Sequence, residues 1–108
     1  MLSNRVKVAA VTLLLGSAAF SGLASAAGDP EAGAEKLTTC VACHDAEGKA
    51  TAPIYPSLAG QSATYLESAL KAYRDGLRGG GMSAVMTPQA TNLSDEDIAD
   101  IAAYYSQQ

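Results

Sequence analysis

The stretch Cys40-Val41-Ala42-Cys43-His44 decides the fold of this 108-residue chain. Its two thiols stand three residues apart and therefore lie on one side of a helical turn, and the histidine follows the second thiol directly. The chain has no other cysteine and no other histidine. A tetrahedral zinc site of cysteine and histidine needs four ligands, and this chain offers three. A Ser-His-Asp site would have to take His44 from this stretch.

The pattern C-x-x-C-H is the attachment motif of c-type haem. Each thiol can form a thioether with one vinyl group of the haem, and His44 is then held beneath the ring, where its imidazole can ligate the iron. A disulfide between Cys40 and Cys43 would close a very short loop and stabilise little. A thioredoxin-like redox pair would need a preceding strand, and the sequence shows no alternating strand pattern. We therefore predict one haem c, attached through Cys40 and Cys43.

The beginning of the chain is typical of a secreted protein. Residues 1–7 carry two bases and no acid, residues 8–20 are uncharged, and small residues follow, ending in Ala24-Ser25-Ala26. This order is that of a secretory signal peptide. The apolar stretch is shorter than the roughly 20 residues of a spanning helix. We predict cleavage of residues 1–26, with cleavage after Ala27 as the alternative, and a periplasmic mature domain of residues 27–108.

The predicted mature domain is acidic and short of large core residues. Removal of Arg5 and Lys7 leaves five bases against eleven acids, a net charge of −6. This charge disfavours nucleic acid and anionic membrane surfaces as partners, and it favours proteins with a basic docking surface. The chain has no tryptophan, and its one phenylalanine lies in the predicted signal segment. Domains of this size commonly need a bound group to complete the core, and we expect the haem to supply it.

The mature chain is predicted to be all-helical. Asp29-Pro30-Glu31 has the cap, the proline and the acid of a helix start, and this helix should run to about Cys40. A second helix is predicted from Ser62 to about Asp75, with Gly76 ending it. Its apolar face consists of Tyr65, Leu66, Ala69, Leu70 and Tyr73.

A third helix is predicted from the stretch that begins at Leu93. Ser94 would cap it, with Asp97 in the reciprocal position of a capping box. Its buried stripe consists of Ile98, Ile101, Ala102 and Tyr105. Residues 45–61 and 77–92 are predicted to be loops, and loops of this length are commonly functional or wrap a bound group.

A second ligand to the iron would distinguish an electron-transfer site from a gas-binding one. His44 is the only histidine, so methionine is the natural candidate, and a thioether raises the reduction potential. The mature chain has two methionines, Met82 and Met86. Thr87-Pro88 would stiffen the chain that carries Met86, whereas Met82 directly follows three glycines. Residue chemistry therefore favours Met86 and leaves Met82 open.

These features together resemble the small single-haem bacterial cytochromes c of class I, especially those that also occur as halves of two-haem tandem cytochromes. The resemblance covers essentially all of residues 27–108. It implies an all-α class I cytochrome c fold, with three to five helices wrapped around one covalently bound haem. The matching stretches are the C-x-x-C-H motif, residues 52–61, Tyr73-Arg74-Asp75-Gly76, Met86-Thr87-Pro88, Leu93–Ile98 and Ala103-Tyr104-Tyr105.

The resemblance also implies ligands to the haem. Cys40 and Cys43 would form the thioethers, and His44 would be the proximal ligand. The axial methionine of such proteins stands eight residues before the serine that caps the last helix, and this position is Met86.

Further residues of the haem pocket follow from the resemblance. The carbonyl of Pro53 would accept a hydrogen bond from the non-ligating nitrogen of the haem histidine. Tyr55 and Leu58 would line the ring. Gly33 and Tyr104 would meet where the first and last helices cross.

Two positions depart from the pattern of these proteins. Asp45 stands where many relatives have glycine directly after the haem histidine, which bears on the geometry of that turn. Gly79-Gly80-Gly81 makes the loop before Met82 looser than usual, which bears on how firmly Met86 is held.

The function that the resemblance implies is electron transport, for example in a respiratory chain, and not catalysis. The protein would be an exported monomer that carries one electron at a time between periplasmic or membrane redox partners, with iron cycling between Fe(II) and Fe(III) and no small-molecule substrate. Lys49, Lys71 or Arg78 could orient docking, with none ranked above the others. One alternative is a haem subunit of a larger dehydrogenase or oxidase. Another, less favoured, is a five-coordinate gas-binding cytochrome.

Overall fold

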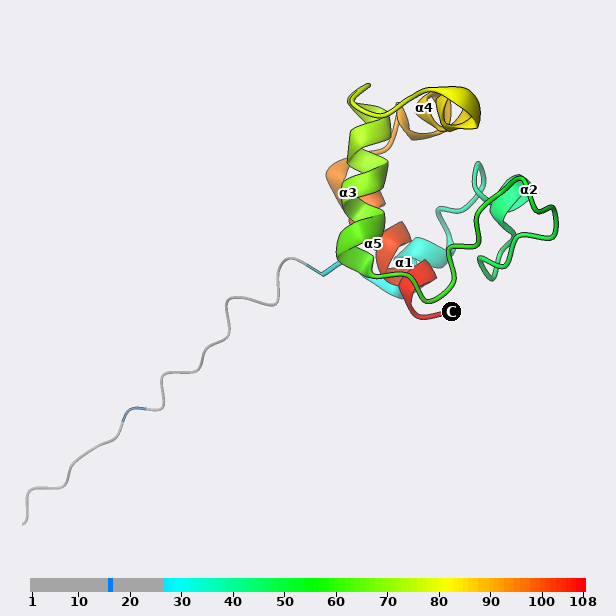
Figure 1. The fold of residues 1–108 in the computed structure, drawn as a ribbon. Coiled ribbons are helices and arrows are strands. Elements are labelled where there is room, and N and C mark those ends of the chain that lie inside the picture. Colours follow the sequence, from blue (N-terminus) through cyan, green and yellow to red (C-terminus); the bar gives the residue numbers. More distant parts are fainter. Residues whose placement is uncertain (1–15, 17–26) are drawn as a thin grey trace, which may run out of the picture.

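The computed structural model describes Gly16 and residues 27–108, so most of the predicted signal segment lies outside the described residues. Within the described residues the chain forms helices and no strand, which confirms the all-α prediction. None of the helices described is long and apolar enough to cross a membrane. In chain order the elements are α1 (Pro30–Ala34), α2 (Val41–His44), α3 (Ala63–Arg74), the 3-10 helix η2 (Gly81–Val85), α4 (Met86–Ala90) and α5 (Asp95–Ser106) (Figure 1).

Helix α1 crosses α5 at a glycine, so that the two backbones touch. A Cβ atom on Gly33 would collide with the backbone carbonyl of Asp100 and lie 3.0 Å from Cβ of Tyr104. Only glycine permits so close an approach. The predicted meeting of Gly33 and Tyr104 is therefore confirmed. The predicted cap is present too, because the Asp29 carboxylate accepts a hydrogen bond of 3.0 Å from the amide of Glu31.

The first helix is shorter than predicted. It ends at Ala34 instead of about Cys40, and the haem-attachment motif forms the separate turn α2. The amides of Glu35 and Lys36 bond to carbonyls three residues back, at 3.2 and 2.9 Å, which tightens the last turn and ends the helix. Thr38-Thr39 follow, and β-branched residues favour helix only weakly.

The second and third predicted helices are confirmed as α3 and α5. Ser62 caps α3, and Gly76 ends it with a φ of +71°. Ser94 and Asp97 form the predicted capping box at the start of α5. All four residues of the predicted stripe on α5 are buried. The core cluster consists of Leu37, Leu66, Ile101, Ala102 and Tyr105.

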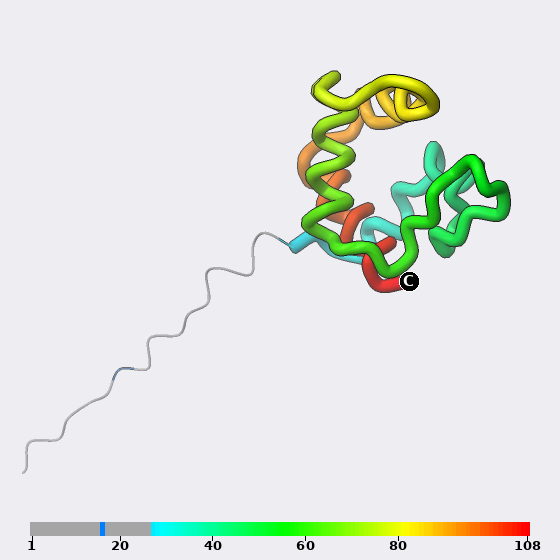
Figure 2. The backbone as a smooth tube through the Cα atoms, viewed as in Figure 1, coloured from blue at the N-terminus to red at the C-terminus, as the bar shows by residue number. Residues whose placement is uncertain are grey.

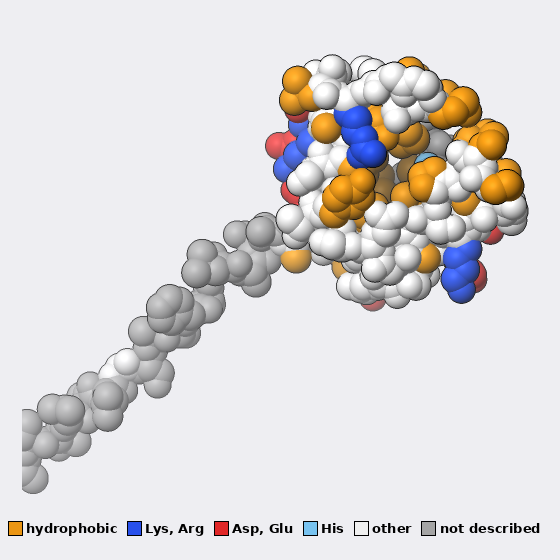
Figure 3. Space-filling view, in the orientation of Figure 1, with side chains coloured by type: hydrophobic (Ala, Val, Ile, Leu, Met, Phe, Trp, Pro, Cys, Tyr) orange, Lys and Arg blue, Asp and Glu red, His pale blue; other side chains and the backbone are white. Residues whose placement is uncertain are grey.

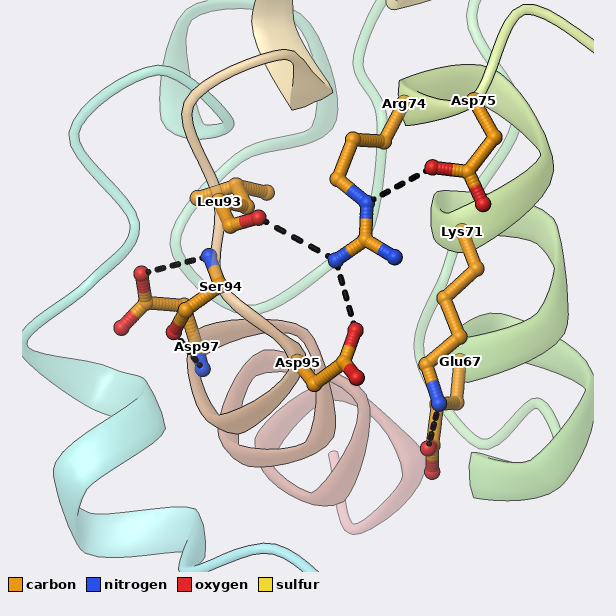
Figure 4. A network of polar contacts seen from close by, with 8 residues as sticks. All are labelled: Glu67, Lys71, Arg74, Asp75, Leu93, Ser94, Asp95 and Asp97. Atoms are coloured by element: carbon orange, nitrogen blue, oxygen red, sulfur yellow. Dashed lines mark hydrogen bonds and ion pairs between the residues drawn. The ribbon is translucent and has the colours of Figure 1, made fainter.

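An arginine joins the end of α3 to the start of α5 (Figure 4). Nη1 of Arg74 lies 2.6 Å from the carboxylate of Asp95 and donates to the carbonyl of Leu93 at 3.3 Å, while Nε pairs with Asp75 at 3.0 Å. Exposed pairs of this kind contribute about 0.2–1 kcal/mol each. Their geometric effect is to hold the apolar face of α3 at a set position over α5.

The segment 77–92, predicted to be a loop, contains the helical turns η2 and α4. Pro88 is the third residue of α4, where its missing N–H would have no helical partner, so proline is compatible with helix here. The segment 45–61 is irregular, as predicted. In Figures 1 and 2 this segment and α2 lie opposite α3, with α4 above both.

Candidate functional site

One face of the molecule is hollowed, and hydrophobic side chains gather around the opening (Figure 3). The space consists of two adjoining hollows. Their empty volumes are about 730 and 1140 Å³, including the space at their open mouths. The hollows share part of their walls, so they are two halves of one cavity. The residues that line both halves are His44, Pro56, Tyr73, Arg78 and Met86.

The first half of the cavity is walled by the apolar stripes of α3 and α5. All five residues predicted to form the apolar face of α3 line it, together with three of the four stripe residues of α5. Two helices in contact would normally bury such stripes against each other. Here the stripes also face a hollow, which has the apolar walls that an apolar bound group requires.

The C-x-x-C-H turn forms the wall opposite α3. Cys40 caps α2 and lines the first half of the cavity, whereas Cys43 lines the second half. Both thiols are free, so the alternative of a disulfide between them is not realised. Burial raises the pKa of the Cys40 thiol, with a smaller opposing effect from Thr39. One thiol thus lines each half of the cavity, an arrangement compatible with attachment of a single ligand at two points.

His44 is buried, with 6% of its surface exposed, and lines both halves of the cavity. Its Nδ1 lies 2.8 Å from the carbonyl oxygen of Pro56. A carbonyl only accepts, so Nδ1 carries the proton and Nε2 keeps its lone pair for a metal. A hydrogen bond of this kind fixes the tautomer and orientation of a ligating imidazole.

The expectation that Pro53 would accept this hydrogen bond was wrong. The chain turns at Ala52, whose carbonyl accepts from the amide of Tyr55 at 3.1 Å. This turn leaves Pro53 exposed and outside both hollows, and it brings the carbonyl of Pro56 within hydrogen-bonding distance of the histidine ring. Sequence could not separate the two prolines, because the turn between them decides which carbonyl faces His44.

The two candidate methionines occupy different positions. Met86 begins α4, is half-buried and lines both halves of the cavity. Met82 is 57% exposed and lines only the second half. Met86 therefore shares with His44 the region where the halves join. Leu58 lines the first half and Tyr55 the second, so the structure brings together all the predicted site residues except Pro53.

Two tyrosines of α5 hold the turn that follows the histidine. Asp45 has φ +67° and ψ 160°, and it is the only non-glycine residue of the described part with a positive φ. Its carbonyl accepts from the hydroxyl of Tyr105 at 2.9 Å, and the carbonyl of Ala46 accepts from Tyr104 at 2.7 Å. Burial raises the pKa of Tyr105. Sequence reasoning missed both contacts, although the aspartate in place of glycine signalled an unusual turn.

The chemistry of this cavity fits a covalently attached haem. It presents two free thiols on one wall, an imidazole with an available nitrogen, a thioether, and otherwise mostly apolar walls. Thiols attach the porphyrin, and imidazole with thioether is an established ligand pair for haem iron.

Comparisons with known proteins agree with this chemistry. The cytochrome c family matches residues 30–108. Cytochrome c-554(548) of Halomonas halodenitrificans is 70% identical over 82 residues, which are 76% of this chain and 99% of that protein. Cytochrome c4 of Pseudomonas aeruginosa is 48% identical over 98 residues, 91% of this chain and 47% of that protein. The crystal structure of reduced recombinant cytochrome c4 from Pseudomonas stutzeri gives a TM-score of 0.67 at 42% identity, covering 76% of this chain and 46% of that one.

The chain therefore belongs to the cytochrome c family. The helical fold is that of a class I cytochrome c, and the cofactor is haem c, as expected from the sequence. Its general role is that of the family, electron transfer. The chain spans about half the length of the cytochromes c4 and nearly the whole of cytochrome c-554(548).

Proposed function

We propose that this protein is an exported monohaem cytochrome c that carries single electrons between periplasmic or membrane-bound redox proteins. The observation that carries the proposal is the position of His44 and Met86, which both line the region where the two halves of the cavity join.

Each site residue has a defined task in this proposal. Cys40 and Cys43 would hold the haem through thioethers, and His44 and Met86 would supply a nitrogen and a sulfur ligand to its iron. The bound haem supplies the one-electron couple Fe(II)/Fe(III). Pro56 holds the imidazole in one orientation, so the histidine needs little movement between oxidation states. The walls of α3 and α5 exclude water from the ring.

Two protein ligands distinguish an electron carrier from a gas-binding cytochrome. With both the His44 nitrogen and the Met86 sulfur as ligands, the iron would have no position left for carbon monoxide or oxygen. Tyr55 and Leu58 line the cavity and contribute to excluding water around these ligands. The reduced protein should therefore bind carbon monoxide slowly or not at all.

Export and partner choice belong to the same proposal. Residues 1–26 direct secretion and are removed, leaving an acidic domain whose net charge of −6 suits partners with basic docking surfaces. Redox encounters of this kind are brief and bury little area. Mass spectrometry of exported protein should give a chain that begins at Ala27 or Gly28 and carries one haem. A mass that includes residues 1–26 would contradict cleavage.

The axial assignment is tested with Met86→Ala, and Met82→Ala is the matched control. Both variants are produced in a host that matures c-type cytochromes. Met86→Ala should keep a normal pyridine haemochrome spectrum, lose the far-red methionine–iron band, lower the reduction potential and bind carbon monoxide when reduced. Met82→Ala should resemble wild type. The reverse pattern would assign the ligand to Met82, and a colourless wild-type product would refute the haem site altogether.

Size measurement separates the free carrier from the alternative of a complex subunit. Under the proposal, the exported holoprotein elutes as a monomer at physiological salt when expressed in its own cell. Co-elution of all the haem with a larger dehydrogenase or oxidase would show that the protein is a fixed subunit.

A further inference from the structure

We propose that Arg78 is a carboxylate-binding residue of the cavity, whose guanidinium pairs with the haem propionates and raises the reduction potential. This inference rests on the proposed function, because it assigns a residue toward the haem. It differs from a docking role for Arg78, in which the arginine would meet a partner protein.

Arg78 is the only charged residue that lines either half of the cavity, and it lines both. Three other basic residues are engaged elsewhere: Lys36 pairs with two aspartates, Lys71 with Glu67, and Arg74 with two aspartates. Within the described residues Arg78 forms no ion pair. A cation without an acidic partner, at the edge of a mostly apolar hollow, provides a place for an anionic part of the bound group.

The turn that ends α3 brings Arg78 back over the cavity. The amide of Gly76 donates to the carbonyl of Tyr73 at 3.2 Å, and the amide of Leu77 donates to the carbonyl of Ala72 at 2.8 Å. This pair of bonds is a Schellman motif, and the φ of +71° at Gly76 permits it. The chain thereby reverses, and Arg78 returns to the face of α3 that carries the cavity-lining tyrosines.

Two tyrosines of α3 hold the guanidinium. Its central carbon lies 4.9 Å from the centre of the Tyr73 ring, within the range of a cation–π contact. Nη1 lies 3.5 Å from the hydroxyl of Tyr65, a long hydrogen bond. Both tyrosines line the first half of the cavity. These contacts use one ring face and one donor, so most of the five N–H groups stay available.

The propionates are the anionic groups that haem brings into such a cavity. A guanidinium binds a carboxylate through two parallel hydrogen bonds, which are stronger than neutral ones. Neutralising a carboxylate near the iron favours Fe(II), the form with one positive charge fewer. Arg78 should therefore raise the reduction potential of the isolated protein, with no partner present.

The test compares Arg78→Gln, Arg78→Lys and Lys49→Gln as holoproteins. Lys49 is exposed, lines neither half of the cavity and makes no ion pair within the described part, so Lys49→Gln removes a matched surface charge. Midpoint potentials are measured by spectroelectrochemical titration. Proton NMR of the ferric protein follows the propionate methylene signals and the methyl signal of the axial methionine.

We expect the decrease in midpoint potential caused by Arg78→Gln to be at least three times the decrease caused by Lys49→Gln. The propionate signals should shift while the methionine methyl signal stays in place, and Arg78→Lys should recover part of the potential. Equal potentials for Arg78→Gln and Lys49→Gln, with unmoved propionate signals, would overturn the inference and leave Arg78 a surface charge. Failure of the proposed function is distinguishable, because a wild-type protein without a methionine methyl signal would contradict the axial ligand alone.

Discussion

Replacing Asp45 by glycine is expected to stabilise the holoprotein. Asp45 directly follows the haem histidine and combines φ +67° with ψ 160°, a backbone region in which glycine is nearly the only residue found. Its carbonyl must accept from Tyr105 at 2.9 Å, and this contact ties the turn to α5. Glycine would keep the carbonyl in place and remove the side chain that strains the turn.

The size of the effect follows from three contributions. A non-glycine residue in such a region costs about 1–3 kcal/mol. Glycine also gives the unfolded chain more conformational freedom, which reduces this gain in stability by about 0.5–1 kcal/mol. The hydrogen bond from the amide of Ala46 to the Asp45 carboxylate, 2.6 Å long, is exposed, so water replaces most of its contribution. The net stabilisation should be about 1 kcal/mol.

Urea unfolding of the oxidised holoprotein measures this change. The midpoint of Asp45→Gly should rise while the slope of the free energy with urea stays constant. Glu47→Gly is the matched control, because Glu47 is exposed in the same turn with a negative φ and should lose about 0.5–1 kcal/mol. Asp45→Asn removes only the charge and should change little. If Asp45→Gly proved as destabilising as Glu47→Gly, the turn would not be strained and this reasoning would be refuted.

Two further predictions concern the contact of α5 with α1 and with Lys36, which follows α1. Gly33→Ala should cost about 3 kcal/mol of stability or prevent holoprotein formation, because the added Cβ would collide with a backbone carbonyl of α5. The control Gly79→Ala, at a glycine with open space around it, should change stability by less than about 1 kcal/mol. Equal effects of the two substitutions would mean that the helices do not cross at Gly33. The ammonium of Lys36, 2.7 Å from the buried carboxylate of Asp100, holds the pKa of that carboxyl below its usual range. This contribution to stability is present above the unfolded-state pKa of about 4 and is lost as the pH falls through the lower folded-state pKa. Lys36→Met should therefore flatten the acid side of a plot of urea midpoint against pH, and an unchanged slope would contradict the role of this pair.

The most local features of the molecule are those that were predicted from sequence. The caps at Asp29 and Ser94 depend on a side chain and an amide within three residues of each other. The C-x-x-C-H motif is equally local, since spacing along one turn decides where its thiols point. Among the local features, the end of helix α1 was predicted wrongly, because no single residue type near Lys36 indicates that the last turn tightens there.

The sequence predicted most of the residues that line the cavity, but it did not predict which of them contact one another. Leu58 and Met86 reach the cavity as expected, whereas Pro53 does not. Arg78 was considered only as a surface charge. Its place in the cavity depends on the reversal after Gly76 together with the position of α3 over α5.

The sequence by itself determined the haem attachment, the helical class and the helix starts, because each depends on interactions between residues a few positions apart. Tertiary structure alone decided that Pro56 holds His44, that Tyr105 secures the turn at Asp45, and that Arg78 lies at the cavity. Those contacts join segments whose relative positions are set by packing around the cavity. No spacing along the chain encodes such a position, so these contacts appear only when the helices are assembled.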